Sequence, residues 1–190
     1  MRKWNILIKK DVFIDDTVLD SIKYNLIKKL EKHGWIFEHS DKSSEAEDNK
    51  EIEIIKKTSI NLYKWCSFFD VLYSSTEDEW FLSLNDFRNN SDSSFSWNEF
   101  EKICIESCSS PEEEKEVRNF WSGHLPVFMS TKNGYQYWAI KTSGENVGAI
   151  YYGREPEFEE VTKIAENFDD LIKKIILSLD KNNKILGIDF

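Results

Sequence analysis

The sequence predicts an α+β fold in which an antiparallel-rich central sheet is covered by helices. The first observation is a stretch of aromatic and β-branched residues, Phe120–Gly153, which turn signals divide into three short runs. The second is a series of segments on either side of it in which apolar residues recur at helical spacing. The third is the length of 190 residues, which suits one sizeable core, so residues 1–190 are expected to form a single domain.

The three runs predict an antiparallel meander over about residues 124–152. They are Leu125–Thr131, Tyr135–Ile140 and Val147–Tyr152. Asn133-Gly134 lies between the first two runs, and this pair best tolerates positive φ at both central positions of a type I′ turn. Ser143–Asn146 separates the last two as a looser turn, whose polar side chains bond to their own backbone.

Further elements are expected before the meander, starting near the N-terminus. Asn5–Ile8 is a candidate short strand, and Asp15 or Asp16 begins a helix because acidic residues favour the positive end of the helix dipole. Gly34 is a natural stop for this helix, and Trp35–Glu38 is either a strand or a packed exit. The apolar stripe of the helix consists of Leu19, Ile22, Leu26 and Leu30.

Helical spacing resumes at Glu51 and leads to the meander through one strand candidate. This second helical region has a weak apolar stripe of Ile52, Ile55 and Ile60 and a stronger one of Leu62, Trp65, Phe69 and Leu72. Glu79–Phe87 is expected to be a strand. Ser96 and Glu99 have the spacing of a capping box, and Pro111 suits the first turn of the helix that precedes the meander.

After the meander, the acidic stretch Glu155–Glu160 contains Pro156 and predicts a connection. The clearest helix of the chain follows, with Asn167 as its cap. Its continuous apolar face consists of Phe168, Leu171, Ile172, Ile175, Ile176 and Leu179. The final six residues are apolar enough to add an edge strand.

Charge favours a basic partner over nucleic acid. The chain has 35 acidic and 25 basic residues, a formal net charge of −10. Such a surface repels nucleic acid, whose binding rests largely on Lys and Arg, and it speeds association with basic proteins. No apolar run reaches the ~20 residues of a membrane helix, and the apolar patch near the N-terminus is too short for a signal peptide, so a cytoplasmic protein without a membrane partner is expected.

The cysteines do not indicate a disulfide framework or a metal site. Cys66, Cys104 and Cys108 form an odd, sparse set. Cys104 and Cys108 lie one helical turn apart and suggest a metal together with His124, but structural zinc needs four organised ligands and no second pair exists. We therefore expect neither a metal nor another cofactor.

Catalysis is not expected either, because no chemical motif stands out. The chain has no Gly-rich phosphate loop, zinc-helix motif or nucleophile elbow. Cys66 and His124 form a nucleophile–base pair only if the fold brings them together. Acidic pairs such as Glu77 with Glu79 are more often solvated than catalytic.

Several segments resemble the SUKH superfamily, which includes Smi/Knr-type fungal cell-wall regulators and many bacterial immunity proteins. The resemblance covers about Phe120–Ile176. It rests on Leu125–Phe128, Asn133-Gly134, Tyr135–Trp138, Val147–Tyr152 and Ile164–Ile172. The Leu-Pro that usually precedes an aromatic helix in this family is absent here, where Ser59–Trp65 occupies the corresponding place.

The resemblance implies a protein that works by binding other proteins. Its bacterial members typically neutralise a toxin delivered by neighbouring cells, often a nuclease, by occluding its active site or substrate groove. The acidic composition suits a basic toxin of this kind. The alternative is an intracellular scaffold or regulator of the Smi/Knr type, and an uncharacterised hydrolase is a third option.

Alternation along the second run leaves two interpretations open. Tyr135 and Tyr137 face one side of the sheet, and Gln136 and Trp138 face the other. Either helices cover both sides, or one aromatic set is exposed and anchors a partner. The second interpretation predicts a partner-binding surface that consists of Tyr137, Trp138, Tyr151, Tyr152, Glu155 and Glu157.

Overall fold

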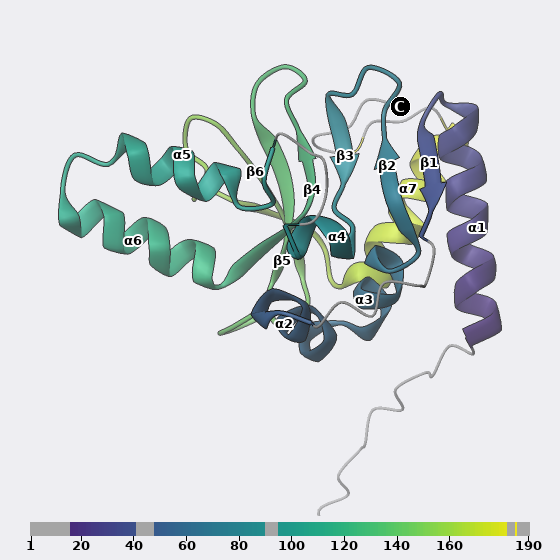
Figure 1. Cartoon of the computed structure of the whole chain (residues 1–190), viewed down its shortest axis with the longest axis horizontal. Helices are drawn as coiled ribbons and strands as arrows, with labels where there is room; N and C mark the ends of the chain where they lie inside the picture. Colours follow the sequence, from purple (N-terminus) through teal and green to yellow (C-terminus); the bar gives the residue numbers. More distant parts are fainter. Residues whose placement is uncertain (1–15, 41–47, 90–94, 182–184, 186–190) are drawn as a thin grey trace, which may run out of the picture.

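Seven strands form one sheet in the part of the chain that the structure describes, and they follow one another in the sheet as in the sequence (Figure 1). This computed structural model describes residues 16–40, 48–89, 95–181 and 185. The strands are β1 (Ile36–His39), β2 (Phe69–Tyr73), β3 (Glu79–Phe81), β4 (His124–Ser130), β5 (Gln136–Lys141), β6 (Ile150–Arg154) and β7 (Thr162–Ala165). Every neighbouring pair is antiparallel, so the predicted α+β class with an antiparallel sheet is confirmed.

Helices cover both faces of the sheet (Figure 1). They are α1 (Asp16–Lys32), α2 (Lys50–Thr58), α3 (Ile60–Cys66), α4 (Leu84–Phe87), α5 (Glu99–Ser107), α6 (Pro111–Ser122) and α7 (Phe168–Lys181). On one face, the ring centroids of Trp121 on α6 and Tyr137 on β5 are 4.9 Å apart. On the other face, Trp65 of α3 lies 5.5 Å from Phe81 on β3 and 6.1 Å from Phe168 on α7. The core therefore has two layers, one on each side of the sheet.

The predicted meander is confirmed as β4, β5 and β6. Asn133 and Gly134 both have positive φ, +59° and +97°, as the predicted turn requires. The third strand begins later than expected, at Ile150, because Asn146 and Gly148 also adopt positive φ and extend the turn. Val147 consequently lies in that turn and is 51% exposed.

Two stretches form a different kind of element from the one predicted: part of a predicted helical region is a strand, and part of a predicted strand is a helix. Phe69 and Leu72 belong to β2, because α3 ends at Cys66 and Leu72 pairs with Phe37 of β1. Of the expected strand Glu79–Phe87, only its first three residues are extended. Its second half is α4, which a capping box between Ser83 and Asp86 starts: the Ser83 amide donates to Asp86 Oδ2 (2.7 Å), and the Asp86 amide donates to Ser83 Oγ (3.3 Å).

The remaining boundaries follow the sequence closely. Gly34 ends the first helical segment with a φ of +84°, Ser110 and Pro111 start α6, and Asn167 Oδ1 accepts from the Asp170 amide at the start of α7. The expected capping box at Ser96 is wrong, since Asn98 precedes the helix and the Ser96 hydroxyl bonds to the side chains of Asn98, Glu99 and Lys102 instead of to a backbone amide. Strand β7 was not expected. The candidate strand Asn5–Ile8, the side chain of Leu19 and the last five residues lie outside the described residues.

Candidate partner-binding surface

Two of the six predicted surface residues lie in the core. Tyr137 and Trp138 are both 0% exposed. Tyr137 packs under α6, and Trp138 packs against Phe128, with ring centroids 4.5 Å apart, on the opposite face. Because helices cover both faces, neither aromatic set of β5 is available to a partner. The prediction that these two residues contact a partner is corrected by this packing.

The other four predicted residues lie in or directly after β6. Tyr151 and Tyr152 are half-buried, and Glu155 and Glu157 are exposed in the loop before β7. The Tyr152 hydroxyl donates to Gln136 Oε1 at 2.7 Å, so it has a structural partner within the sheet. The acidic residues of the predicted surface are therefore exposed, whereas its two tyrosines are half-buried and belong mainly to the sheet.

Most of the net negative charge lies on α5, α6 and the β6–β7 loop, which we call the acidic lobe (residues 99–122 and 155–161). The lobe holds eleven acidic and three basic residues, a net charge of −8 out of −10 for the chain. Including Arg154 at the end of β6 changes this only to −7. The acidic residues are Glu99, Glu101, Glu106, Glu112, Glu113, Glu114, Glu116, Glu155, Glu157, Glu159 and Glu160.

An aromatic stack joins the three parts of the acidic lobe. Phe158 of the β6–β7 loop stacks on Phe100 of α5, with ring centroids 5.2 Å apart. The hydroxyl of Tyr137 donates to the Phe158 carbonyl, so the loop is also fixed to β5. Gly153 leaves the space that the Tyr137 ring occupies, since a Cβ there would lie 2.4 Å from that ring. The β6–β7 loop is thus held against α5, which also packs on α6, so acidic residues far apart in the sequence lie on neighbouring segments.

Few of these carboxylates are neutralised. Among the described residues, only Glu99 and Glu114 of the acidic lobe form ion pairs, with Lys102 (3.2 Å) and Arg118 (2.7 Å). Most of the others, including Glu106 and Glu116, are exposed. Concentrated charge with few counter-charges creates a strong local potential that attracts a cationic surface.

A cleft of about 260 Å³ opens at the border of the acidic lobe. Residues of the first turns of α2 and α5, the last turns of α6 and the start of β4 line it. Its polar and aromatic walls include Lys50, Glu51, Trp97, Glu101, Trp121 and His124. The cleft therefore combines two indole rings with two carboxylates, Glu51 and Glu101, and two cationic side chains, Lys50 and Arg118.

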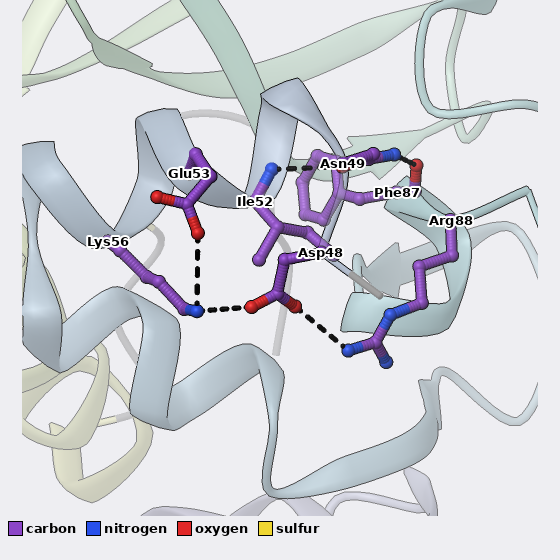
Figure 2. A network of polar contacts seen from close by, with 7 residues as sticks. All are labelled: Asp48, Asn49, Ile52, Glu53, Lys56, Phe87 and Arg88. Carbon is purple, nitrogen blue, oxygen red and sulfur yellow. Dashed lines mark hydrogen bonds and ion pairs between the residues drawn. The ribbon is translucent and has the colours of Figure 1, made fainter. Parts of the chain in front are cut away.

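A polar network fixes the helix that forms one wall of this cleft (Figure 2). Asp48 pairs with Lys56 and, through Oδ1, with Arg88 Nη2 at 3.1 Å. The pKa of Asp48 lies below its usual value, chiefly because of the hydrogen bond from Lys56. Asn49 caps α2 by accepting from the Ile52 amide at 3.1 Å, and its Nδ2 donates to the Phe87 carbonyl at 2.6 Å. The first turn of α2 is thus tied to α4.

His124 is a structural residue at the cleft wall. Its Nδ1–H donates to the Phe120 carbonyl (2.9 Å), and its Nε2 accepts from the Lys141 ammonium (3.2 Å). Because a carbonyl only accepts and an ammonium only donates, the imidazole is neutral. Burial lowers its pKa, which agrees with that protonation state.

The cysteines lie apart from any exposed reactive site. Cys66 is 1% exposed and burial raises the pKa of its thiol, so the thiol form prevails. Burial, followed by the charge of Glu159, raises the pKa of Cys104 to about 12. Within the described residues, no three or more His, Cys, Asp and Glu side chains come together as a metal site. Nor does that part of the chain contain a helix with the length and apolar character needed to cross a membrane.

The acidic lobe was only partly predictable from the sequence. The runs of Glu in the chain signal it, and two of its members, Glu155 and Glu157, were predicted. The contribution of Phe158 and the cleft beside Glu101 were missed, because both depend on contacts between distant segments.

Comparison of the chain with protein-family models, with curated proteins and with solved structures gave no match.

Proposed function

We propose that this protein is an immunity protein of the SUKH type, which binds a basic protein toxin and neutralises it by occluding its active site or substrate groove. The observation that carries the proposal is the acidic lobe, where a net charge of −8 is held by 31 residues on one side of the fold. A nuclease is the best-fitting class of toxin, because its substrate groove must be basic to bind phosphates.

The acidic lobe has the properties that such a role requires. Its charges are mostly exposed and unpaired within the described residues, so a cationic partner does not have to displace internal ion pairs. Its supporting residues, Phe100, Tyr137 and Phe158, are buried and hold the surface in a fixed shape. Opposite charge raises the rate of encounter, and like charge excludes wrong partners.

The test is affinity capture with two charge-matched variants of the tagged protein. The lobe variant carries Glu→Gln at four exposed positions whose carboxylates form no hydrogen bond or ion pair within the described residues: Glu106, Glu116, Glu157 and Glu160. The control variant carries Glu→Gln at four exposed positions elsewhere: Glu31, Glu38, Glu145 and Glu166. Both variants have the same net charge, so only the location of the charge differs.

We expect the wild type and the control to retain one basic partner from the source cells at low salt, and the lobe variant to lose it. The association rate of the purified pair should fall about tenfold or more in the lobe variant and less than about threefold in the control. Expression of the partner alone should arrest growth, and co-expression of this chain should restore it. Equal capture by both variants, or a partner without toxicity such as a kinase or cell-wall enzyme, would refute the proposal and favour a regulator of the Smi/Knr type.

A further inference from the structure

We propose that the cleft between α2, α5, α6 and β4 receives a single arginine side chain of the basic partner. This inference rests on the proposed function, because the cleft adjoins the acidic lobe where that partner would bind. The inference adds one specific contact to the general attraction between the acidic lobe and a basic partner.

The size of the cleft suits one side chain. The cleft has a volume of about 260 Å³. Pockets for drug-sized ligands begin near ~300 Å³. The cleft is thus at the lower end of ligand sites, and it matches a long side chain better than a cofactor.

Glu101 is the residue that points to a cation. It is half-buried on α5, and within the described residues no hydrogen bond or ion pair is made by its carboxylate. Burial raises its pKa, and only the nearby positive charge of Arg118 opposes this. Arg118 itself is exposed and directs its guanidinium to Glu114, with Nε and Nη2 at 2.8 and 2.7 Å from Oε1. A guanidinium in the cleft would offset the desolvation of Glu101.

The aromatic walls favour arginine over lysine. Trp97 is half-buried and Trp121 is 7% exposed, and both line the cleft together with Glu101. A planar guanidinium stacks on an indole face while its fork pairs with a carboxylate, whereas an ammonium is a more strongly hydrated point charge. Arginine and tryptophan are also the residue types that most often anchor interfaces in central pockets.

Arg118 also lines the cleft and opposes the inference, although its guanidinium pairs with Glu114. The second opposing charge is that of Lys50. Lys50 is exposed at the first position of α2, beside Glu51, and it forms no ion pair within the described residues. Its ammonium would repel an arriving guanidinium. Removal of the Lys50 charge should therefore raise the affinity for the arginine side chain. This change is opposite in direction to the loss expected on removal of the Glu101 charge, so it tests the proposal independently.

The experiment uses the full-length protein with ¹⁵N-labelled tryptophan indoles. The probe is the peptide acetyl-Gly-Arg-Gly-amide, and the matched control peptide contains citrulline, which has the same shape without the charge. The indole signals of Trp97 and Trp121 are assigned with Trp→Phe variants. We expect both signals to shift with the arginine peptide at millimolar concentration and neither to shift with the citrulline peptide.

Three variants complete the test. Glu101→Gln should weaken binding of the arginine peptide by about tenfold or more, since a charge-assisted hydrogen bond is lost. Lys50→Gln should tighten it about two- to threefold. Glu38→Gln, an exposed change on β1 away from the acidic lobe and the cleft, should leave it unchanged. Equal shifts with both peptides, or binding unaffected by Glu101→Gln, would overturn the inference.

Its failure is distinguishable from failure of the proposed function. If the lobe variant loses the captured partner but Glu101→Gln retains it at full affinity, the function stands and the arginine pocket is refuted. If the arginine peptide binds as expected while the lobe variant captures its partner normally, the pocket stands and the proposed toxin-binding role of the acidic lobe is refuted.

Discussion

Gly153→Ala should destabilise the protein by steric pressure on a ring that cannot move. The added Cβ would lie 2.4 Å from Cζ and Oη of Tyr137 and 2.5 Å from Cε1, distances that real Cβ atoms do not show. The ring is 0% exposed, lies 4.9 Å from that of Trp121, and its hydroxyl donates to the Phe158 carbonyl. Relief of the clash therefore requires movement of the ring and loss of this hydrogen bond.

The expected magnitude combines these two effects. Overpacking of a core typically costs about 1–3 kcal/mol, and a broken buried hydrogen bond costs about 1–3 kcal/mol, so the free energy of unfolding should fall by about 2–6 kcal/mol. For a chain of this size, each 1 kcal/mol lowers Tm by about 2–4 °C, which predicts a decrease of about 4–24 °C. Gly153 does not have positive φ, so backbone strain adds nothing.

Urea and thermal unfolding followed by circular dichroism measure this decrease. Gly123→Ala is the matched control, since its Cβ would meet the movable Ser143 hydroxyl at 3.0 Å, and it should change stability by less than about 1 kcal/mol. In a Tyr137→Leu background, Gly153→Ala should lose most of its effect, because the clashing atoms are gone. If Gly153→Ala is neutral, or costs the same in both backgrounds, the ring does not lie over Gly153 and its placement in the core is wrong.

The other predictions concern the first turn of α2 and the thiols. Asp48→Asn should reduce the loss of stability in acid. The pKa of Asp48 is lowered in the folded state, chiefly by Lys56, so the stability that Asp48 contributes is present above its unfolded pKa of about 3.9 and is lost as the pH falls through the folded pKa. Unfolding measurements between about pH 5 and 2 will test this. Asn49→Ala should lower the free energy of unfolding by about 1–2 kcal/mol in urea titrations, because it removes the helix cap and a bond to α4. Thiol labelling of the native protein at pH 8 should modify Cys108 before Cys66, which is buried and should react only on unfolding.

Each of these expectations has a clear contrary result. Parallel acid profiles for wild type and Asp48→Asn would show that the ion pairs of Asp48 contribute no pH dependence. An unchanged urea midpoint for Asn49→Ala would show that this cap does not contribute to the stability of the protein. Rapid labelling of Cys66 in the native state would contradict its burial.

Local chemistry determined much of the fold. Asn133 and Gly134 specify their turn because few other residues tolerate positive φ, and the apolar and aromatic runs on either side of them specify β4 and β5. The long apolar face of α7 and the Pro111 start of α6 are likewise properties of short segments. Composition alone also established that the chain is acidic. These features were predictable because each depends on residues close in sequence.

Tertiary structure decided which faces are buried and which segments come together. The alternation of Tyr137 and Trp138 showed that they face opposite sides of the sheet, but their burial depends on α6 and on Phe128, which other parts of the chain supply. Phe69 and Leu72 match a helical spacing, yet pairing with β1 makes them part of a strand. Periodicity reports which side chains share a face, whereas burial depends on what packs against that face. The acidic lobe and the cleft beside Glu101 arise for the same reason, since each is assembled from distant segments whose contacts no local pattern records.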